Sequence, residues 1–132
     1  MVQFAGSYQF VSADNDEALL TALGVAAAKR KIVLNLKPEV NVSVDGDHWT
    51  ISTASAIHSS KREFDLGQPH QFTAQDGRAV TGTVTKEGNK LVETQRHEQG
   101  LDLEITREFT DSQMIMTSKV GDVVSVRVHQ RK

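Results

Sequence analysis

One arginine near the C-terminal end of this 132-residue chain lies on the apolar side of an expected strand. Side chains of a β-strand alternate between two faces, so Arg107 shares a face with Leu103, Ile105 and Phe109. A guanidinium directed into an apolar interior is costly unless an anion or hydrogen-bond acceptors meet it. The pattern therefore predicts an anion beside Arg107, and two sources remain open. The anion is either a bound ligand or a neighbouring carboxylate such as Glu93 or Asp76.

A second arginine, Arg127, belongs to another expected strand near the C-terminus. Alternation there groups Val124, Val126 and Val128 on one face, and places Arg127 and His129 on the opposite face. On this pattern alone the valines face inward and Arg127 faces solvent.

Catalytic and metal-binding patterns are missing from the sequence. The chain has no cysteine, no glycine-rich phosphate loop and no nucleophile elbow. Its histidines lack metal-ligand spacing. We expect no catalytic residues, no metal site and no cofactor. The histidines are His48, His58, His70, His97 and His129.

The length of the chain favours a single domain over residues 1–132 with a core of its own. The net charge of −2 gives no reason to expect a nucleic-acid partner. No secretory signal begins the chain, and no apolar run approaches the roughly 18 residues that span a bilayer. The expected location is the cytoplasm, with the nucleus as a second compartment.

A helical hairpin is expected early, over about residues 15–36. Asp14 and Glu17 resemble a capping box at the start of its first helix, and Gly24 is a plausible stop. The second helix is expected from Val25 onward, and Pro38 prevents it from continuing.

The rest of the chain reads as an antiparallel meander, because turn signals recur about every ten residues. Counting the strand before the helices gives about ten strands. A meander of that length usually closes into an up-and-down barrel, which removes its exposed edges. With only 5% aromatic and 38% hydrophobic residues, the strands are short of bulk to fill the interior. An all-β barrel with a cavity, capped by a helix-turn-helix lid, is the predicted fold.

Short motifs along the whole chain resemble those of the intracellular lipid-binding proteins, which include fatty-acid-binding and cellular retinoic-acid-binding proteins. Singly each motif is weak, but their order and spacing are specific. They are Phe4-x-Gly6-x-Tyr8, Leu23-Gly24-Val25, Lys37-Pro38, Glu63-Phe64-x-Leu66-Gly67, Asp76-Gly77-Arg78, Glu87-Gly88-Asn89-Lys90-Leu91-Val92, Arg107-Glu108-Phe109 and Gly121-Asp122-Val123-Val124.

The resemblance implies a ten-stranded barrel of two near-orthogonal sheets, a helical lid, an internal cavity and no catalysis. It also implies that two arginines and a tyrosine bind a ligand carboxylate. Here these positions are Arg107, Arg127 and His129, so the resemblance places Arg127 inward, against the alternation. Asp16 and Ile57 stand where many relatives have a portal phenylalanine. The residues expected to line the portal and cavity are Val25, Lys29, Val33, Ile57, Asp76, Ile105 and Met116.

The function implied is binding and transport of long-chain fatty acids by a monomer. A carrier of retinoic acid or a bile acid remains the nearest alternative. A membrane-associated structural lipid-binding protein and an enzyme are more distant ones. Lys29, Arg30 and Lys31 form a basic patch that suggests weak, transient contact with anionic membranes.

Overall fold

The computed structural model describes residues 4–35, 37–55, 59–73, 79–97 and 102–132. Ten strands and two short helices make up this part of the chain. The helices are α1 (Asp16–Ala22) and α2 (Ala27–Leu34). The strands are β1 (Gly6–Asp14), β2 (Glu39–Asp45), β3 (His48–Ala54), β4 (Ser59–Asp65), β5 (His70–Thr73), β6 (Ala79–Glu87), β7 (Lys90–His97), β8 (Leu103–Phe109), β9 (Gln113–Val120) and β10 (Val123–Arg131).

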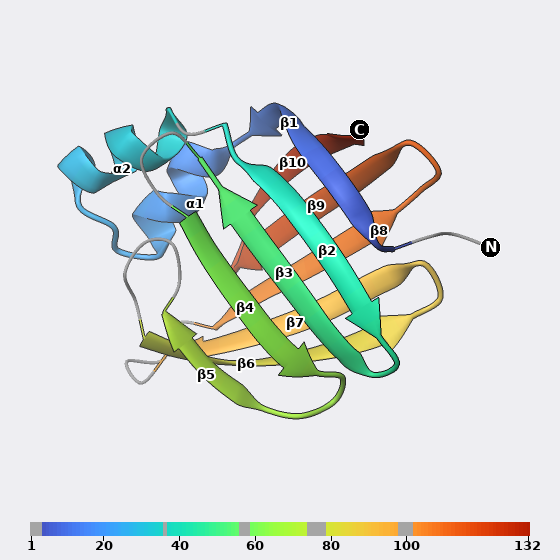
Figure 1. The fold of residues 1–132 in the computed structure, drawn as a ribbon. Helices are drawn as coiled ribbons and strands as arrows, with labels where there is room; N and C mark the ends of the chain where they lie inside the picture. The colour runs from blue at the N-terminus through green and yellow to red at the C-terminus, as the bar shows by residue number, and fades with distance from the viewer. Residues whose placement is uncertain (1–3, 36, 56–58, 74–78, 98–101) are drawn as a thin grey trace.

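All ten strands join one antiparallel sheet in the order β4-β3-β2-β1-β10-β9-β8-β7-β6-β5. Pairing of β1 with β10 brings the two ends of the chain together and bends the sheet around a central space. Figure 1 shows the result as two layers, with β2, β3 and β4 crossing in front of β7, β8 and β9. The predicted all-β, ten-stranded up-and-down barrel is confirmed.

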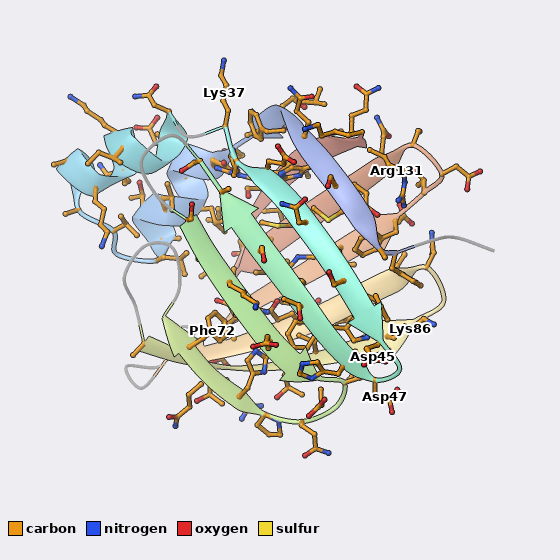
Figure 2. All side chains as sticks on the ribbon, viewed as in Figure 1. Lys37, Asp45, Asp47, Phe72, Lys86 and Arg131 are labelled. Atoms are coloured by element: carbon orange, nitrogen blue, oxygen red, sulfur yellow. The ribbon has the colours of Figure 1, made fainter. Side chains whose placement is uncertain are left out.

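The barrel is closed by side chains where β4 faces β5, because these strands are the two ends of the sheet order. The ring of His70 stacks between Phe64 and Phe72, with 5.2 Å between centroids on each side. The guanidinium carbon of Arg62 lies 4.0 Å from the centre of the Phe72 ring, and Figure 2 labels this phenylalanine. Aromatic packing thus replaces the missing strand ladder.

The two helices form the predicted lid at one end of the barrel, away from the β2–β3 turn (Figure 1). Gly24 adopts a left-handed φ of 81° after α1, which confirms its role as a stop. The start of α1 differs from the expected capping box, because Asn15 is the N-cap and provides no side-chain cap. Instead Asn15 Nδ2 donates to the Val124 carbonyl at 2.9 Å and ties the helix to β10. No described helix is long and apolar enough to cross a membrane.

Two apolar clusters occupy the two ends of the barrel. One packs Tyr8, Trp49 and Phe109 far from the lid, and the other packs Leu20 of α1 against Ile105 and neighbouring strand residues. Polar and charged side chains lie between these clusters. The candidate site is therefore a polar middle with apolar ends.

Candidate functional site

A cavity of about 480 Å³ lies inside the barrel beneath the lid. This volume falls within the range of about 300–1,000 Å³ that is usual for small-molecule sites. Ile105, Arg107, Met116, Arg127 and His129, all predicted from the sequence, are among the lining residues. The others are Asp16, Leu19, Leu20, Leu23, Pro38, Val40, Ile51, Thr53, Ser60, Lys61, Arg62, Phe72, Gln95, Leu103, Met114, Ser118 and Ser125.

On one side of the cavity, Arg62, Glu93 and Arg107 form a group that we call the Glu93 cluster. Arg107 Nη1 donates to Glu93 Oε1 at 2.6 Å, and Arg62 Nη1 and Nη2 bind the same carboxylate at 2.9 and 3.0 Å. Gln95 Nε2 adds a fourth hydrogen bond, to Glu93 Oε2 at 2.8 Å. The sequence left open whether a ligand or a neighbouring carboxylate would pair with Arg107. The structure shows a neighbouring carboxylate there, that of Glu93.

The two arginines lower the pKa of Glu93 by more than burial raises it. Burial alone would raise the pKa of Glu93, but the guanidiniums of Arg107 and Arg62 lower it to about 2. Glu93 is thus an anion at neutral pH, although its side chain is fully buried. The cluster therefore combines two cations with one anion.

Three strands and one glycine position the Glu93 cluster. Glu93 and Arg107 lie diagonally on the paired strands β7 and β8. Arg62 reaches Glu93 from β4, across the seam where side chains close the barrel between β4 and β5. Gly82 on β6 makes room behind them. A Cβ there would lie 2.8 Å from Phe72 and 3.4 Å from Glu93 Oε2, so a larger residue would displace the seam.

The other arginine, Arg127, binds a carboxylate from the lid. Its Nε and Nη2 each lie 2.6 Å from Asp16 Oδ2, and we call this ion pair the Asp16 pair. Both side chains are nearly buried, with 12% of Arg127 and 7% of Asp16 exposed. On β8 and β10, Arg107 and Arg127 flank the same residue of β9, Met116. The two charged groups are thus neighbours on one wall.

His129 is neutral at physiological pH in this setting. Burial, together with the nearby charges of Arg127 and Arg107, lowers its pKa to about 4. The ring packs edge-on against Phe10 at 5.8 Å. Within the described residues neither of its nitrogens has a hydrogen-bond partner. A neutral imidazole offers one donor and one acceptor, so His129 can meet a polar group in the cavity.

The alternation reading of β10 is wrong, and the inward placement implied by the resemblance is right. Ser125 and His129 are buried and Arg127 lines the cavity, whereas Val124 is 41% exposed. The reason is the polar lumen. A strand that lines a charged cavity presents polar residues inward and valines outward, which reverses the usual pattern.

The portal residues expected from the sequence have varied positions. Val25 is buried in the cluster under the helices, Lys29 is exposed on α2, and neither is among the cavity-lining residues. Ile57, Asp76 and the side chain of Val33 lie outside the described residues. Their role at a portal stays a prediction.

Sequence reasoning missed Arg62 as a site residue and did not foresee that Asp16 would bind Arg127. Arg62 shares the inward face of β4 with Phe64, which is the same signal that identified Arg107. Asp16 gave no such signal, because its partner lies 111 residues away in the sequence.

The buried ion pairs leave an excess of one positive charge inside the barrel, without counting the exposed Lys61 at the cavity. Among the described residues, the two buried carboxylates of Glu93 and Asp16 meet three guanidiniums, those of Arg62, Arg107 and Arg127. No group of three His, Asp or Glu residues in the described ranges could hold a metal ion. These groups can bind an anion in a cavity whose wall is partly polar and partly apolar.

Comparisons with known proteins agree with this geometry. The model of the lipocalin / cytosolic fatty-acid binding protein family matches residues 2–132. A fatty acid-binding protein of Tyrophagus putrescentiae is 40% identical over 133 residues, which cover 100% of both chains. Fatty acid-binding protein 9 of Homo sapiens is 34% identical, over 97% of this chain and 96% of its own.

A solved structure of a Schistosoma mansoni fatty acid binding protein in complex with arachidonic acid superimposes with a TM-score of 0.94. It is 32% identical and covers 98% of this chain and 96% of its own. The matched family model and these relatives span nearly the whole barrel and its lid. The chain belongs to the lipocalin / cytosolic fatty-acid binding protein family.

Proposed function

We propose that this protein binds and transports long-chain fatty acids, with the carboxylate held by Arg107 and Arg127 and a third hydrogen bond from His129. The observation that carries this proposal is the excess positive charge inside a cavity of the barrel that is also lined by apolar side chains. One carboxylate balances that charge, and one alkyl chain fills the remaining apolar surface. The proteins of this family are carriers rather than enzymes, as expected from the sequence.

The alkyl chain supplies most of the binding free energy. Burying each methylene is worth about 0.8 kcal/mol, so fifteen methylenes give an upper estimate of about 12 kcal/mol. Loss of ligand motion offsets several kcal/mol of this gain. Leu20, Ile105 and Met116 are among the apolar side chains that an alkyl chain would contact.

The arginines supply selectivity for an acid. Hydrogen bonds to charged groups contribute about 1.5–3 kcal/mol each, because both partners are shielded from water. Glu93 binds Arg107 and Arg62 at the same time, so one carboxylate charge is set against two guanidinium charges, and the remaining positive charge can be balanced by a ligand carboxylate. Arg127 is available to a ligand once the Asp16 pair opens.

Contact with membranes belongs to the same proposal. Lys29 and Lys31 are exposed on α2, whereas Arg30 donates to the Val25 carbonyl at 2.7 Å. Each exposed charge near an anionic surface contributes about 1 kcal/mol, which suits a brief encounter during ligand delivery. Delivery of a fluorescent fatty acid to anionic vesicles should slow in a Lys29→Gln/Lys31→Gln variant and stay unchanged with neutral vesicles. If the unaltered protein delivered the fatty acid to anionic and neutral vesicles at equal rates, the proposed contact with anionic membranes would be contradicted. We place the protein in the cytoplasm as a monomer.

Displacement of a fluorescent fatty acid by oleate tests the proposal, with native mass spectrometry of the purified protein to identify any bound lipid. We expect one oleate per chain. Arg107→Gln should weaken oleate binding by about tenfold or more, since it removes one charged hydrogen bond. Arg96→Gln is the matched control, because Arg96 is exposed on the neighbouring strand β7. Failure of oleate to displace the probe would refute the proposal, and tighter binding of retinoic acid would favour that ligand class.

A further inference from the structure

A carboxylate of the chain itself occupies the ligand side of Arg127. Asp16 is the first residue of α1, and its Oδ2 accepts hydrogen bonds from Nε and Nη2 of Arg127 at 2.6 Å. Both residues line the cavity. The contact has the donors and the acceptor that a bound fatty acid would use.

We propose that Asp16 is an internal competitor for the ligand carboxylate, so that the Asp16 pair must open before an acid can bind Arg127. This inference rests on the proposed function and adds a selectivity residue to it. Asp16 belongs to the lid, and Arg127 belongs to the barrel wall. Binding of an acid therefore detaches one point at which the lid is fixed to the barrel.

The Glu93 cluster has a different arrangement and does not act in this way. Glu93 is held by two arginines and by Gln95, and all four residues belong to strands. A ligand carboxylate can therefore bind there while Glu93 stays in place. Asp16 has one described cationic partner, so a ligand that takes Arg127 leaves Asp16 without one.

The short helix that carries Asp16 can move without breaking a strand. Helix α1 has seven residues and no side-chain N-cap. Besides the Asp16 pair, a hydrogen bond from Asn15 to the Val124 carbonyl and the apolar contacts of Leu19 and Leu20 hold it to the barrel. Rotation of its first turn would carry Asp16 toward water, where the free carboxylate is well solvated.

With competition of this kind, the apparent affinity for an acid equals the intrinsic affinity multiplied by the fraction of molecules in which the ion pair is open. If the pair is closed in about nine of ten molecules, the apparent affinity for an acid falls about tenfold. A neutral ligand of the same length does not need Arg127 and is not affected. The contrast between an acid and its alcohol therefore isolates the contribution of Asp16.

Titration of oleate and oleyl alcohol into Asp16→Asn tests the inference. We expect oleate to bind about tenfold tighter than to the unaltered protein, and oleyl alcohol to bind equally well to both. Asp16→Ala, which removes the carboxylate in another way, should give the same gain and guards against a folding defect in one variant. Glu17→Gln is the matched control, because Glu17 is exposed on the same turn of α1.

The double variant Asp16→Asn/Arg127→Gln should lose the gain, since the competition acts through Arg127. An unchanged oleate affinity in Asp16→Asn, an equal gain for oleyl alcohol, or a gain retained in the double variant would each overturn the inference. These outcomes leave the proposed function intact as long as the unaltered protein binds oleate. Absence of oleate binding in both the unaltered protein and Asp16→Asn would reject both proposals.

Discussion

The Glu93 cluster and the Asp16 pair neutralise the arginines of the cavity in different ways. Each keeps guanidiniums inside a barrel, where an unpaired charge costs several kcal/mol. The Glu93 cluster does so with one carboxylate shared by Arg62 and Arg107, all on strands. The Asp16 pair uses one carboxylate for Arg127, and that carboxylate comes from the lid. The cluster is fixed and has surplus positive charge, whereas the pair is neutral and can open.

We expect the Glu93 cluster to matter more for stability and the Asp16 pair to matter more for ligand binding. Removing the acid of the fixed cluster should harm the fold, because nothing else in the described barrel neutralises its arginines. Removing the acid of the lid should harm the fold less and should alter ligand binding more.

The largest effect is expected for Glu93→Gln. This change leaves Arg62 and Arg107 without their anion inside the barrel, and breaking a buried pair in this way costs about 3–5 kcal/mol. Urea unfolding monitored by Trp49 fluorescence measures the loss. Glu104→Gln, on the exposed face of β8, is the control and should change stability by no more than about 0.5 kcal/mol. A loss below about 1 kcal/mol in Glu93→Gln would contradict the structural role of the cluster.

Acid should weaken the barrel through His129 before it affects Glu93. The pKa of His129 is lowered from 6.5 to about 4 by burial and by Arg127 and Arg107, so the unfolded chain binds this proton more readily. Stability is full above pH 6.5 and falls as the pH decreases to about 4, by about 3 kcal/mol. Unfolding free energies at a series of pH values measure this slope.

A His129→Gln variant should lose most of that slope. His70 keeps a part of it, because burial and the charge of Arg62 also lower its pKa. Glu93 acts in a lower window, and its contribution is lost as the pH falls from 4.5 toward 2, where its carboxylate is protonated. An equal slope between pH 6.5 and 4 in His129→Gln would show that another group titrates there.

A smaller loss of stability is expected for Asp16→Asn than for Glu93→Gln. Arg127 loses its anion, but it lies beside the lid and remains 12% exposed, so water can reach it when α1 moves. The expected cost is about 1–3 kcal/mol, which is the cost of leaving one polar group unsatisfied. The same urea titration checks it. A loss equal to that of Glu93→Gln would mean that the Asp16 pair is as fixed as the cluster.

The sequence predicted the fold well because turns and strand alternation are local signals. Ten strands, the helical hairpin and the stop at Gly24 follow from residues close together in the chain. Arg107 followed from alternation, since its apolar neighbours Leu103 and Phe109 are also buried. The capping box of Asp14 and Glu17 failed because Asp14 is the last residue of β1 and Asn15 is the N-cap. The side chain of Asn15 bonds to β10, a contact that no local pattern encodes.

The candidate site was harder to predict, because its order depends on contacts between distant residues. Arg127 could be placed inward only by resemblance, since β10 presents valines outward around a polar lumen. The link from Arg62 to Glu93 crosses the seam between β4 and β5, and the link from Asp16 to Arg127 joins lid to wall. Each requires the closed barrel, so neither follows from the order of residues alone.

The central claim is that the cavity carries one surplus positive charge and therefore selects an anion. Calorimetric titration of the unaltered protein with oleate and with oleyl alcohol near neutral pH tests it most directly. The two ligands share nearly the same alkyl chain and differ in the charge of the head group. We predict that oleate binds at least about tenfold tighter, as expected for one charged hydrogen bond. Equal affinity for the acid and the alcohol would contradict the account.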